Sequence, residues 1–211
     1  MTPVLRSDES VPGPTLLLRP WDSGDIPELL DIYRSPVMRQ ASRNPIVTEQ
    51  HAQRWLEVQQ QGWTDGRRLS FAVRDIHPGD ESGRLVGNVA LKGCQAGKDA
   101  AEVGYWTAAT VRNRGIASQA VELLTAWAFE SFGAQGLQRL ELFHQQDNLA
   151  SCRVAQKSGY ALITVLPPEP PTFPSPGHLH VRESPGSAST TSARLSTPRR
   201  ERVPGSGARP E

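Results

Sequence analysis

Six consecutive residues, Arg112-Asn113-Arg114-Gly115-Ile116-Ala117, have the composition of an anion-binding loop. They include no proline and no acid, so every backbone amide can donate a hydrogen bond and no carboxylate repels an anion. An apolar-periodic stretch follows, which places these amides at the start of a helix, where unpaired N–H groups and partial positive charge suit a pyrophosphate. Gly115 would let the backbone come close to the anion. Taken alone, the segment could equally be an arginine-rich loop that caps a core helix.

The sequence lacks two other phosphate-binding patterns, G-x-x-x-x-G-K-[ST] and G-x-G-x-x-G. These patterns are typical of nucleoside triphosphate and dinucleotide sites. Both kinds of site are therefore disfavoured.

Periodicity predicts a mixed α/β domain in which this loop joins a strand to the strongest helix. Strands are expected at residues 16–19, 69–73, 84–91, 102–107, 140–144 and 160–165, and residues 178–182 could return as a last strand. Helices are expected from Asp25 to a stop at Pro36, from an N-cap at Thr48 to Gly62 or Gly66, and over residues 115–132 and 148–157. The long helix would bury Ile116, Ala120, Leu123, Leu124 and Trp127. The strands at 69–73 and 84–91 form a predicted hairpin, with His77, Pro78, Gly79 and Gly83 in its loop.

Two blocks of this sequence carry a resemblance to a known family. The loop matches the R/Q-x-x-G-x-G/A signature of GNAT acetyltransferases and, as in that family, follows a strand and opens a long helix. The second block, from Asn148 to Tyr160, is similar to the family's N-x-x-S-x-x-V-x-x-K-x-G-[FY] helix. The resemblance covers about residues 14–182 and is closest to the branch that acetylates N-terminal alanine of ribosomal proteins. It implies the GNAT fold, a mixed sheet flanked by helices.

The resemblance implies acetyl-CoA as the co-substrate, bound between two splayed parallel strands at residues 102–107 and 140–144. Backbone groups of Tyr105, Trp106 and Thr107 would pair with the pantetheine arm. The pyrophosphate would lie on Arg112, Asn113, Arg114, Gly115, Ile116 and Ala117. Asn148 would contact the cofactor from the last helix, or it could serve only as that helix's N-cap.

Acetylation of an amine requires a base, because a protonated amine cannot attack a thioester. Glu102 is the candidate, directly or through water; the alternative is an exposed strand carboxylate in an ion pair with a nearby arginine. The family's usual acid is a tyrosine seven residues after the asparagine, but that position holds Ala155. Ser151 is the substitute candidate, unless it is only part of the first turn of its helix. A backbone N–H near Tyr105 or Trp106 would stabilise the oxyanion.

Cysteine and histidine could add other chemistry. Cys152 or Cys94 could carry an acetyl group in a ping-pong route, but Cys152 is favoured as a small core residue. His144 could relay protons or be an ordinary core or edge histidine. His178 and His180 alternate on one expected strand, yet with Cys152 they show no metal-ligand spacing. No metal is therefore expected.

Three aromatic residues of the early helices, Tyr33, Trp55 and Trp63, could line the acceptor pocket. The favoured interpretation is that these three residues are ordinary aromatic residues of the core. They therefore do not identify the acceptor.

Length and composition predict one domain with a tail. The 211 residues, 37% of them hydrophobic, carry a net charge of +1, which gives no reason to expect a nucleic-acid or membrane surface. We expect a flexible leader at residues 1–13, the catalytic domain at 14–182 and a disordered tail at 183–211. The first forty residues contain no apolar stretch long enough for a signal peptide or a membrane span, so a cytoplasmic location is expected. The protein is expected as a monomer or a homodimer.

The expected function is direct transfer of acetyl to a primary amine. A protein or peptide N-terminus is the leading acceptor. A small-molecule amine, such as an antibiotic or polyamine, is the second. A non-catalytic acyl-CoA sensor is the alternative of another class.

Overall fold

The structure is a computed structural model that describes residues 3–8, 13–42, 44–170 and 174–186. Most of the expected tail, residues 187–211, lies outside this part. The described residues form one eight-stranded sheet in the order β1-β2-β3-β4-β5-β6-β8-β7. Its strands are β1 (Leu5–Arg6), β2 (Thr15–Pro20), β3 (Arg68–His77), β4 (Asp80–Lys92), β5 (Ala100–Thr107), β6 (Arg139–Gln145), β7 (Ala161–Leu166) and β8 (Gly177–Glu183). The α-helices are α1 (Ile26–Tyr33), α2 (Pro36–Ala41), α3 (Glu49–Asp65), α4 (Ile116–Phe132) and α5 (Leu149–Lys157).

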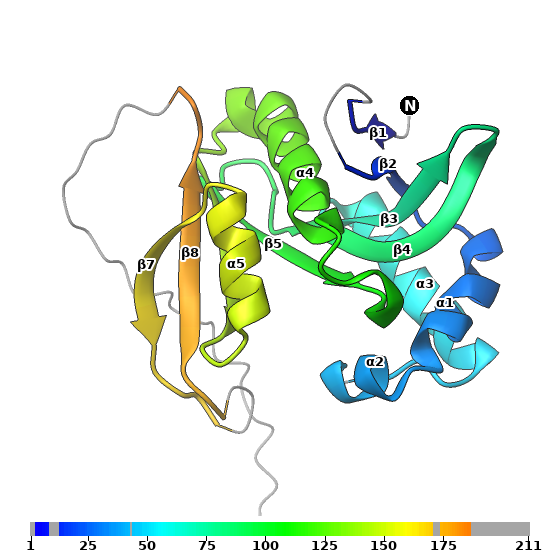
Figure 1. Cartoon of the computed structure of the whole chain (residues 1–211). Coiled ribbons are helices and arrows are strands. Elements are labelled where there is room, and N and C mark those ends of the chain that lie inside the picture. The colour runs from blue at the N-terminus through cyan, green and yellow to red at the C-terminus, as the bar shows by residue number, and fades with distance from the viewer. Residues whose placement is uncertain (1–2, 9–12, 43, 171–173, 187–211) are drawn as a thin grey trace, which may run out of the picture.

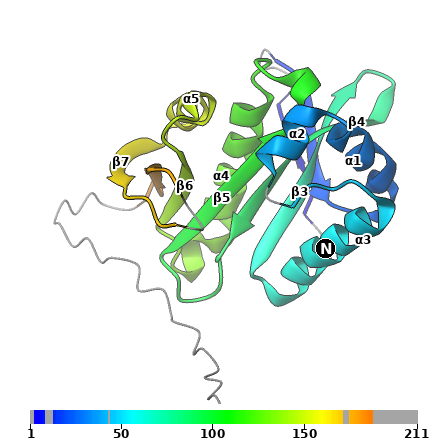
Figure 2. The ribbon, with the colours of Figure 1, turned by 90° about the horizontal axis from the view of Figure 1, so that it is seen from below.

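Helices cover both faces of the sheet (Figures 1 and 2). On one face, α4 crosses β4 and β5, and α5 packs against β6 and β7. On the other, α3 packs against β3, and α1 packs against α3, with Trp21 and Tyr33 in the buried cluster there. Two buried clusters result, a larger one under α4 and a smaller one under α1 and α3. The predicted mixed α/β fold is confirmed.

The sheet opens between its two central strands. β5 and β6 are parallel, and residues 100–103 of β5 lie opposite residues 139–142 of β6. Beyond this register β5 continues to Thr107 alongside β4, while β6 continues to Gln145 alongside β8. Residues 104–107 therefore have no strand partner on their β6 side among the described strands. This is the splay that the resemblance implied.

Local sequence signals account for much of the two long helices, α3 and α4. Thr48 caps α3 by accepting a hydrogen bond from the amide of His51, and Gly66 ends the helix in the left-handed conformation. In α4 the buried residues are Ile116, Ala120, Val121, Leu124, Thr125 and Ala128. Leu123 and Trp127 of the expected stripe are only partly buried, so the buried face is rotated relative to the prediction.

Two elements of the amino-terminal third differ from expectation. Leu5 and Arg6, within the expected leader, form an edge strand that pairs with β2, and Ser7 Oγ accepts a hydrogen bond from the amide of Leu16. Pro36 was expected only to stop the first helix, but it also begins α2. At the first position of a helix the N–H that proline lacks is not needed.

The order of the carboxyl-terminal strands in the sheet differs from their order in the sequence. β8 inserts between β6 and β7 and is antiparallel to both. The predicted hairpin is confirmed as β3 and β4, but its turn is tighter than expected, since Gly83 lies within β4. No helix of the described residues is long and apolar enough to cross a membrane.

Candidate active site

The loop at residues 112–117 presents free backbone amides before α4. Among the hydrogen bonds of the described residues, no amide of this segment is a donor, and no side chain caps the helix. Gly115 has φ 83°, and Asn113, with φ 63°, is the one non-glycine residue of the described chain at positive φ. Left-handed residues in such a turn direct successive N–H groups into one concavity, which is a geometry for binding anions. The amide cradle predicted from the sequence is therefore available to a ligand.

The two arginines of this loop have partners on other elements. Arg114 forms an ion pair with the buried Asp75 of β3 at 3.0 Å. A guanidinium nitrogen of Arg112 lies 4.0 Å from the sulfur of Met38 in α2. These contacts join the loop to the sheet and to α2, so at least Arg114 helps to hold the cradle in place.

A pair of hydroxyls lies where β5 faces α5. The hydroxyl of Tyr105 donates a hydrogen bond to Ser151 Oγ at 3.0 Å. Burial is the main cause that raises the pKa of Tyr105, while the bond to Ser151 acts in the opposite direction. Sequence reasoning used only the backbone of Tyr105 and missed its phenol, because nothing in the linear pattern placed it beside Ser151, 46 residues away.

Asn148 is the N-cap of α5. Its side-chain oxygen accepts a hydrogen bond from the amide of Ser151 at 3.1 Å. The structure therefore shows Asn148 in the capping role that the sequence allowed as an alternative to cofactor contact. The cap also fixes the first turn, in which Ser151 lies.

Glu102 points to the opposite face of the sheet from Tyr105, because the two residues are an odd number of positions apart on β5. Its carboxylate forms an ion pair with Lys92 on β4, its direct neighbour in register. Glu102 therefore does form an ion pair, which was the alternative to its role as a base. The partner is a lysine and not the expected arginine. The side chain is 41% exposed, and its Oε2 has no hydrogen-bond partner among the described residues.

The early aromatic residues belong to the core. Tyr33 is buried and meets Trp106 edge-to-face, and Trp55 packs on Trp21. Trp63 contacts Phe71 and donates its indole N–H to the carbonyl of Ser70. These contacts agree with the favoured reading, but Trp106 on the Glu102 face of β5 brings this aromatic cluster next to the opening of the sheet.

One hollow of the described residues lies away from these groups. It has a volume of about 550 Å³ and lies at the far end of α4 from the cradle, between Trp63, Cys94, Trp127 and Phe132. Its lining is largely apolar and includes the carboxylate of Asp65, which does not suit a diphosphate. Cys94 is buried, and burial raises the pKa of its thiol.

Four side chains from three elements lie together beneath α5, although three of them show no metal-ligand spacing in the sequence. They are Cys152 of α5, His144 of β6, and His178 and His180 of β8, with ligand atoms all within 4.8 Å of one another. The signal that reveals them is the register of β6 and β8, which places His144 opposite His178. Linear spacing does not contain that information.

The fold is shared with solved acetyltransferases. RimL, a ribosomal L7/L12 alpha-N-protein acetyltransferase solved with coenzyme A, is 17% identical, with a TM-score of 0.71 over 86% of this chain and 98% of that one. RimJ of Mycobacterium smegmatis, solved with CoA-disulfide, is 20% identical, with a TM-score of 0.69 over 87% of both chains. MccE, a microcin C7 self-immunity acetyltransferase solved with acetyl-CoA and AMP, is 16% identical, with a TM-score of 0.68 over 82% and 97%. At these identities the likeness shows the fold.

Membership of a family is shown by the sequence itself. No curated protein matches this chain significantly. A family model described as an acetyltransferase (GNAT) domain matches residues 15–161, well over half of the 211 residues. The match includes the splayed strand β5, the amide loop and α5. The chain therefore belongs to the GNAT acetyltransferase family, and it is an acetyl-CoA-dependent N-acetyltransferase.

Proposed function

We propose that this enzyme acetylates the N-terminal amine of a protein or peptide, by direct transfer from acetyl-CoA in a ternary complex. The main observation in support of acetyl transfer is the row of unpaired amides at residues 112–117, beside the opening between β5 and β6. The choice of acceptor is supported by two neighbours in fold, RimL and RimJ, of which RimL acts on the N-terminus of a ribosomal protein according to its description.

The chain's own groups fit coenzyme A. The amides of residues 112–117 would hold the pyrophosphate, with Gly115 and Asn113 supplying the left-handed turn. The free edge of residues 105–107 would pair with the amides of the pantetheine arm. Asn148, whose oxygen caps α5, has its side-chain NH₂ left to donate to the cofactor. Bound there, acetyl-CoA would supply a thioester carbonyl at the opening of the sheet.

Glu102 would act as the base on the face of the sheet covered by α1 and α3. Lys92 binds Oε1 and so orients the carboxylate, which leaves Oε2 to accept a proton from the amine through a water molecule. Trp106 lies on the same face and would border the acceptor. In this arrangement the amine and the diphosphate lie on different sides of the opening.

Ser151 would assist the departure of the thiolate on the other face. Tyr105 donates to Ser151 Oγ, so the serine hydroxyl is free to donate a hydrogen bond to the sulfur, which departs as the thiolate. A free thiol has a pKa of about 8.5, well below that of a phenol, so the thiolate would not take the proton of Tyr105. Tyr105, with its raised pKa, is then a positioning residue that keeps its proton and orients Ser151.

The acceptor can be identified by direct competition between amine classes. The untagged enzyme would be incubated with isotopically labelled acetyl-CoA and a panel of peptides with different N-termini, polyamines and aminoglycosides, and the products identified by mass spectrometry. We expect labelled α-amines on peptides. Exclusive labelling of a small amine, the acceptor class suggested by the fold neighbour MccE, would overturn the proposed acceptor. Tight binding of coenzyme A in calorimetry with no labelled product would contradict the whole proposal.

A further inference from the structure

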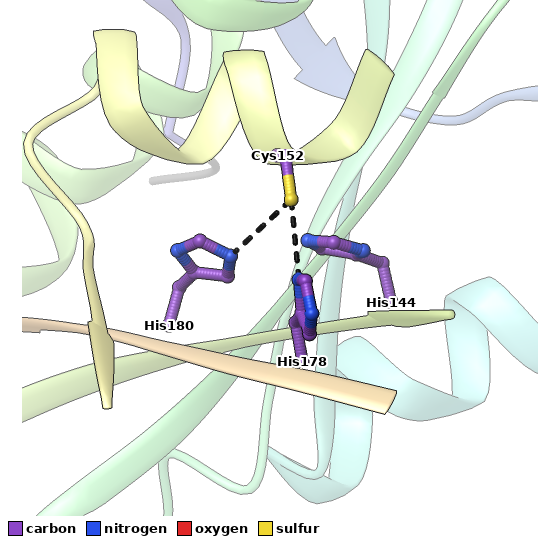
Figure 3. A group of neighbouring side chains, drawn as sticks. All are labelled: His144, Cys152, His178 and His180. Atoms are coloured by element: carbon purple, nitrogen blue, oxygen red, sulfur yellow. Dashed lines mark hydrogen bonds between the residues drawn. The ribbon is translucent and has the colours of Figure 1, made fainter. Parts of the chain in front are cut away.

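The cluster beneath α5 has the composition of a metal site and is not used by the proposed transfer. Figure 3 shows the thiol of Cys152 pointing from α5 toward three imidazoles that project from the sheet below. Cys152 Sγ lies 3.2 Å from Nδ1 of His178 and 3.9 Å from Nε2 of His180. The rings of His144 and His180 are stacked with centroids 5.1 Å apart. One thiol and three imidazole nitrogens therefore converge on one point.

Hydrogen bonds to the backbone fix which ring nitrogens face this point. Nδ1 of His144 lies 2.7 Å from the carbonyl oxygen of Gln145, and Nδ1 of His180 lies 3.3 Å from that of Tyr160. A carbonyl can only accept, so both Nδ1 atoms carry the hydrogen and both Nε2 atoms present a lone pair. This is the arrangement by which metal-binding histidines are usually oriented through their second nitrogen.

One of these lone pairs has no partner among the residues that the structure describes. His144 Nε2 is buried and accepts no hydrogen bond from any described residue. A buried acceptor without a partner is unfavourable, and it is rare in folded proteins. A bound cation would satisfy it. The same cation would also explain why three imidazoles and a thiol converge although no carboxylate in the described part of the chain is hydrogen-bonded to any of them.

We propose that His144, Cys152, His178 and His180 bind one Zn²⁺ ion. Thiolate and imidazole together form a ligand set that suits zinc, which is held tetrahedrally in most protein sites. Tetrahedral bonds of about 2.0–2.3 Å would place the ligand atoms roughly 3.3–3.7 Å apart. The four atoms already lie within 4.8 Å, so small rotations of the side chains would close the site. This proposal departs from the expectation of no metal, which relied on linear spacing alone.

Four protein ligands leave no open coordination position, so the site would be structural and not catalytic. Its ligands come from α5, β6 and β8, and zinc would tie the helix to the two strands. Cys152 is adjacent to Ser151, whose position in the proposed transfer depends on that helix. Zinc binding would convert the Cys152 thiol to a thiolate, release one proton to solvent, and remove this cysteine as a carrier of acetyl groups.

The test measures zinc directly, without acetyl-CoA, so its outcome is independent of the proposed transfer. Untagged protein would be purified without chelators, and its metal content measured by mass spectrometry. We expect one zinc per chain and, in chelator-stripped protein, one equivalent that rebinds and raises the melting temperature. Cobalt substituted for zinc should show a thiolate-to-cobalt charge-transfer band together with the visible bands of a tetrahedral ion.

Matched variants locate the site. Cys152→Ser and His178→Gln should each weaken zinc binding by more than the roughly 10- to 100-fold that loss of an outer-shell partner costs. Cys94→Ser and His77→Gln make the same changes outside the cluster and should leave zinc content unchanged. Circular dichroism of the metal-free proteins would establish that each variant folds.

Three results would overturn the proposal. The first is purified protein that holds no zinc and binds none on titration. The second is zinc binding that persists unchanged in both cluster variants. The third is stable acetylation of Cys152 by acetyl-CoA in the presence of zinc, because that would mean the thiol serves as a nucleophile and not as a ligand.

Discussion

At the scale of single residues, the proposed chemistry depends on side chains that stand on opposite faces of β5. Tyr105 faces α5 and donates to Ser151, and Glu102 faces the other side and pairs with Lys92. The family's usual position for an acid holds Ala155, which is fully buried, so the carboxyl-terminal helix offers no phenol there. The hydroxyl of Tyr105 approaches the same helix from the sheet instead.

Replacing Tyr105 by Phe should slow the reaction without weakening cofactor binding. The change removes one hydrogen bond that orients Ser151, and such a bond is worth about 0.5–1.5 kcal/mol, so kcat should fall about 2- to 10-fold. Steady-state kinetics would measure kcat and the KM for acetyl-CoA separately, and KM should not change. Tyr160→Phe removes the hydroxyl of another interior tyrosine, which is bonded to Thr125, and should leave kcat unaltered. Equal kcat for wild type and Tyr105→Phe would remove Tyr105 from the mechanism.

Replacing Glu102 by Gln should lower kcat far more than Tyr105→Phe does. The substitution keeps the shape of the side chain but removes a base that would accept the proton of the amine, and loss of a general base costs about 100-fold or more. Glu122→Gln is the control, because Glu122 is 42% exposed and also forms an ion pair, with Arg182. Stopped reactions with a saturating peptide would give both rates. If the two variants retain similar activity, Glu102 serves only in its ion pair with Lys92.

At the scale of elements, the loop before α4 depends on one glycine. Gly115 has φ 83°, where an alanine costs roughly 1–2 kcal/mol, yet an added Cβ would meet no atom within 4 Å. Gly115→Ala should therefore fold with a stability lower by about that amount. Relaxation of the strained turn would move amides away from the pyrophosphate, and we expect coenzyme A to bind about tenfold more weakly in calorimetry.

Gly133 provides the matched control for this change. It follows α4 at φ −57°, and an added Cβ would also meet nothing there. Gly133→Ala should keep both stability and cofactor affinity. Unchanged coenzyme A affinity in Gly115→Ala would show that the amides of this loop do not hold the pyrophosphate.

The elements themselves were largely predictable because each carries a local signal. The alternating apolar residues of β3 and β5, the Thr48 cap and the left-handed Gly66 all act within a few residues. The element α2 was missed because Pro36 stops one helix and also starts another, and both readings fit the same residue. The insertion of β8 between β6 and β7 was not predictable, since strand order depends on tertiary pairing and not on local pattern.

The part of the candidate active site that is formed by backbone groups could be predicted from the sequence. The unpaired amides of residues 112–117 follow from a proline-free segment before a helix, and the structure has them free. Contacts between side chains distant in sequence were not predictable. The bond from Tyr105 to Ser151 and the approach of His144 to His178 both depend on how strands and α5 pack.

At the scale of the whole molecule, the sheet separates three regions with different roles. In our proposal the face under α1 and α3 receives the amine through Glu102, and the face under α4 holds the cofactor. Beyond the opening, the proposed zinc would join β6 and β8 to α5. The same packing buries tyrosine side chains, and burial raises the pKa of Tyr33, Tyr105 and Tyr160 alike.

Stability of the whole fold should therefore fall at alkaline pH, with Tyr160 as the largest contributor. Tyr160 is 1% exposed and shares a 2.6 Å hydrogen bond with Thr125 of α4, and burial raises its pKa to about 12. The unfolded chain loses this proton near pH 10, but the folded chain keeps it, so the contribution is complete below about pH 10 and disappears between pH 10 and about 12. Urea unfolding from pH 8 to 11 should show stability decreasing more steeply in wild type than in Tyr160→Phe. Parallel pH profiles for the two proteins would mean that ionisation of Tyr160 is not linked to unfolding.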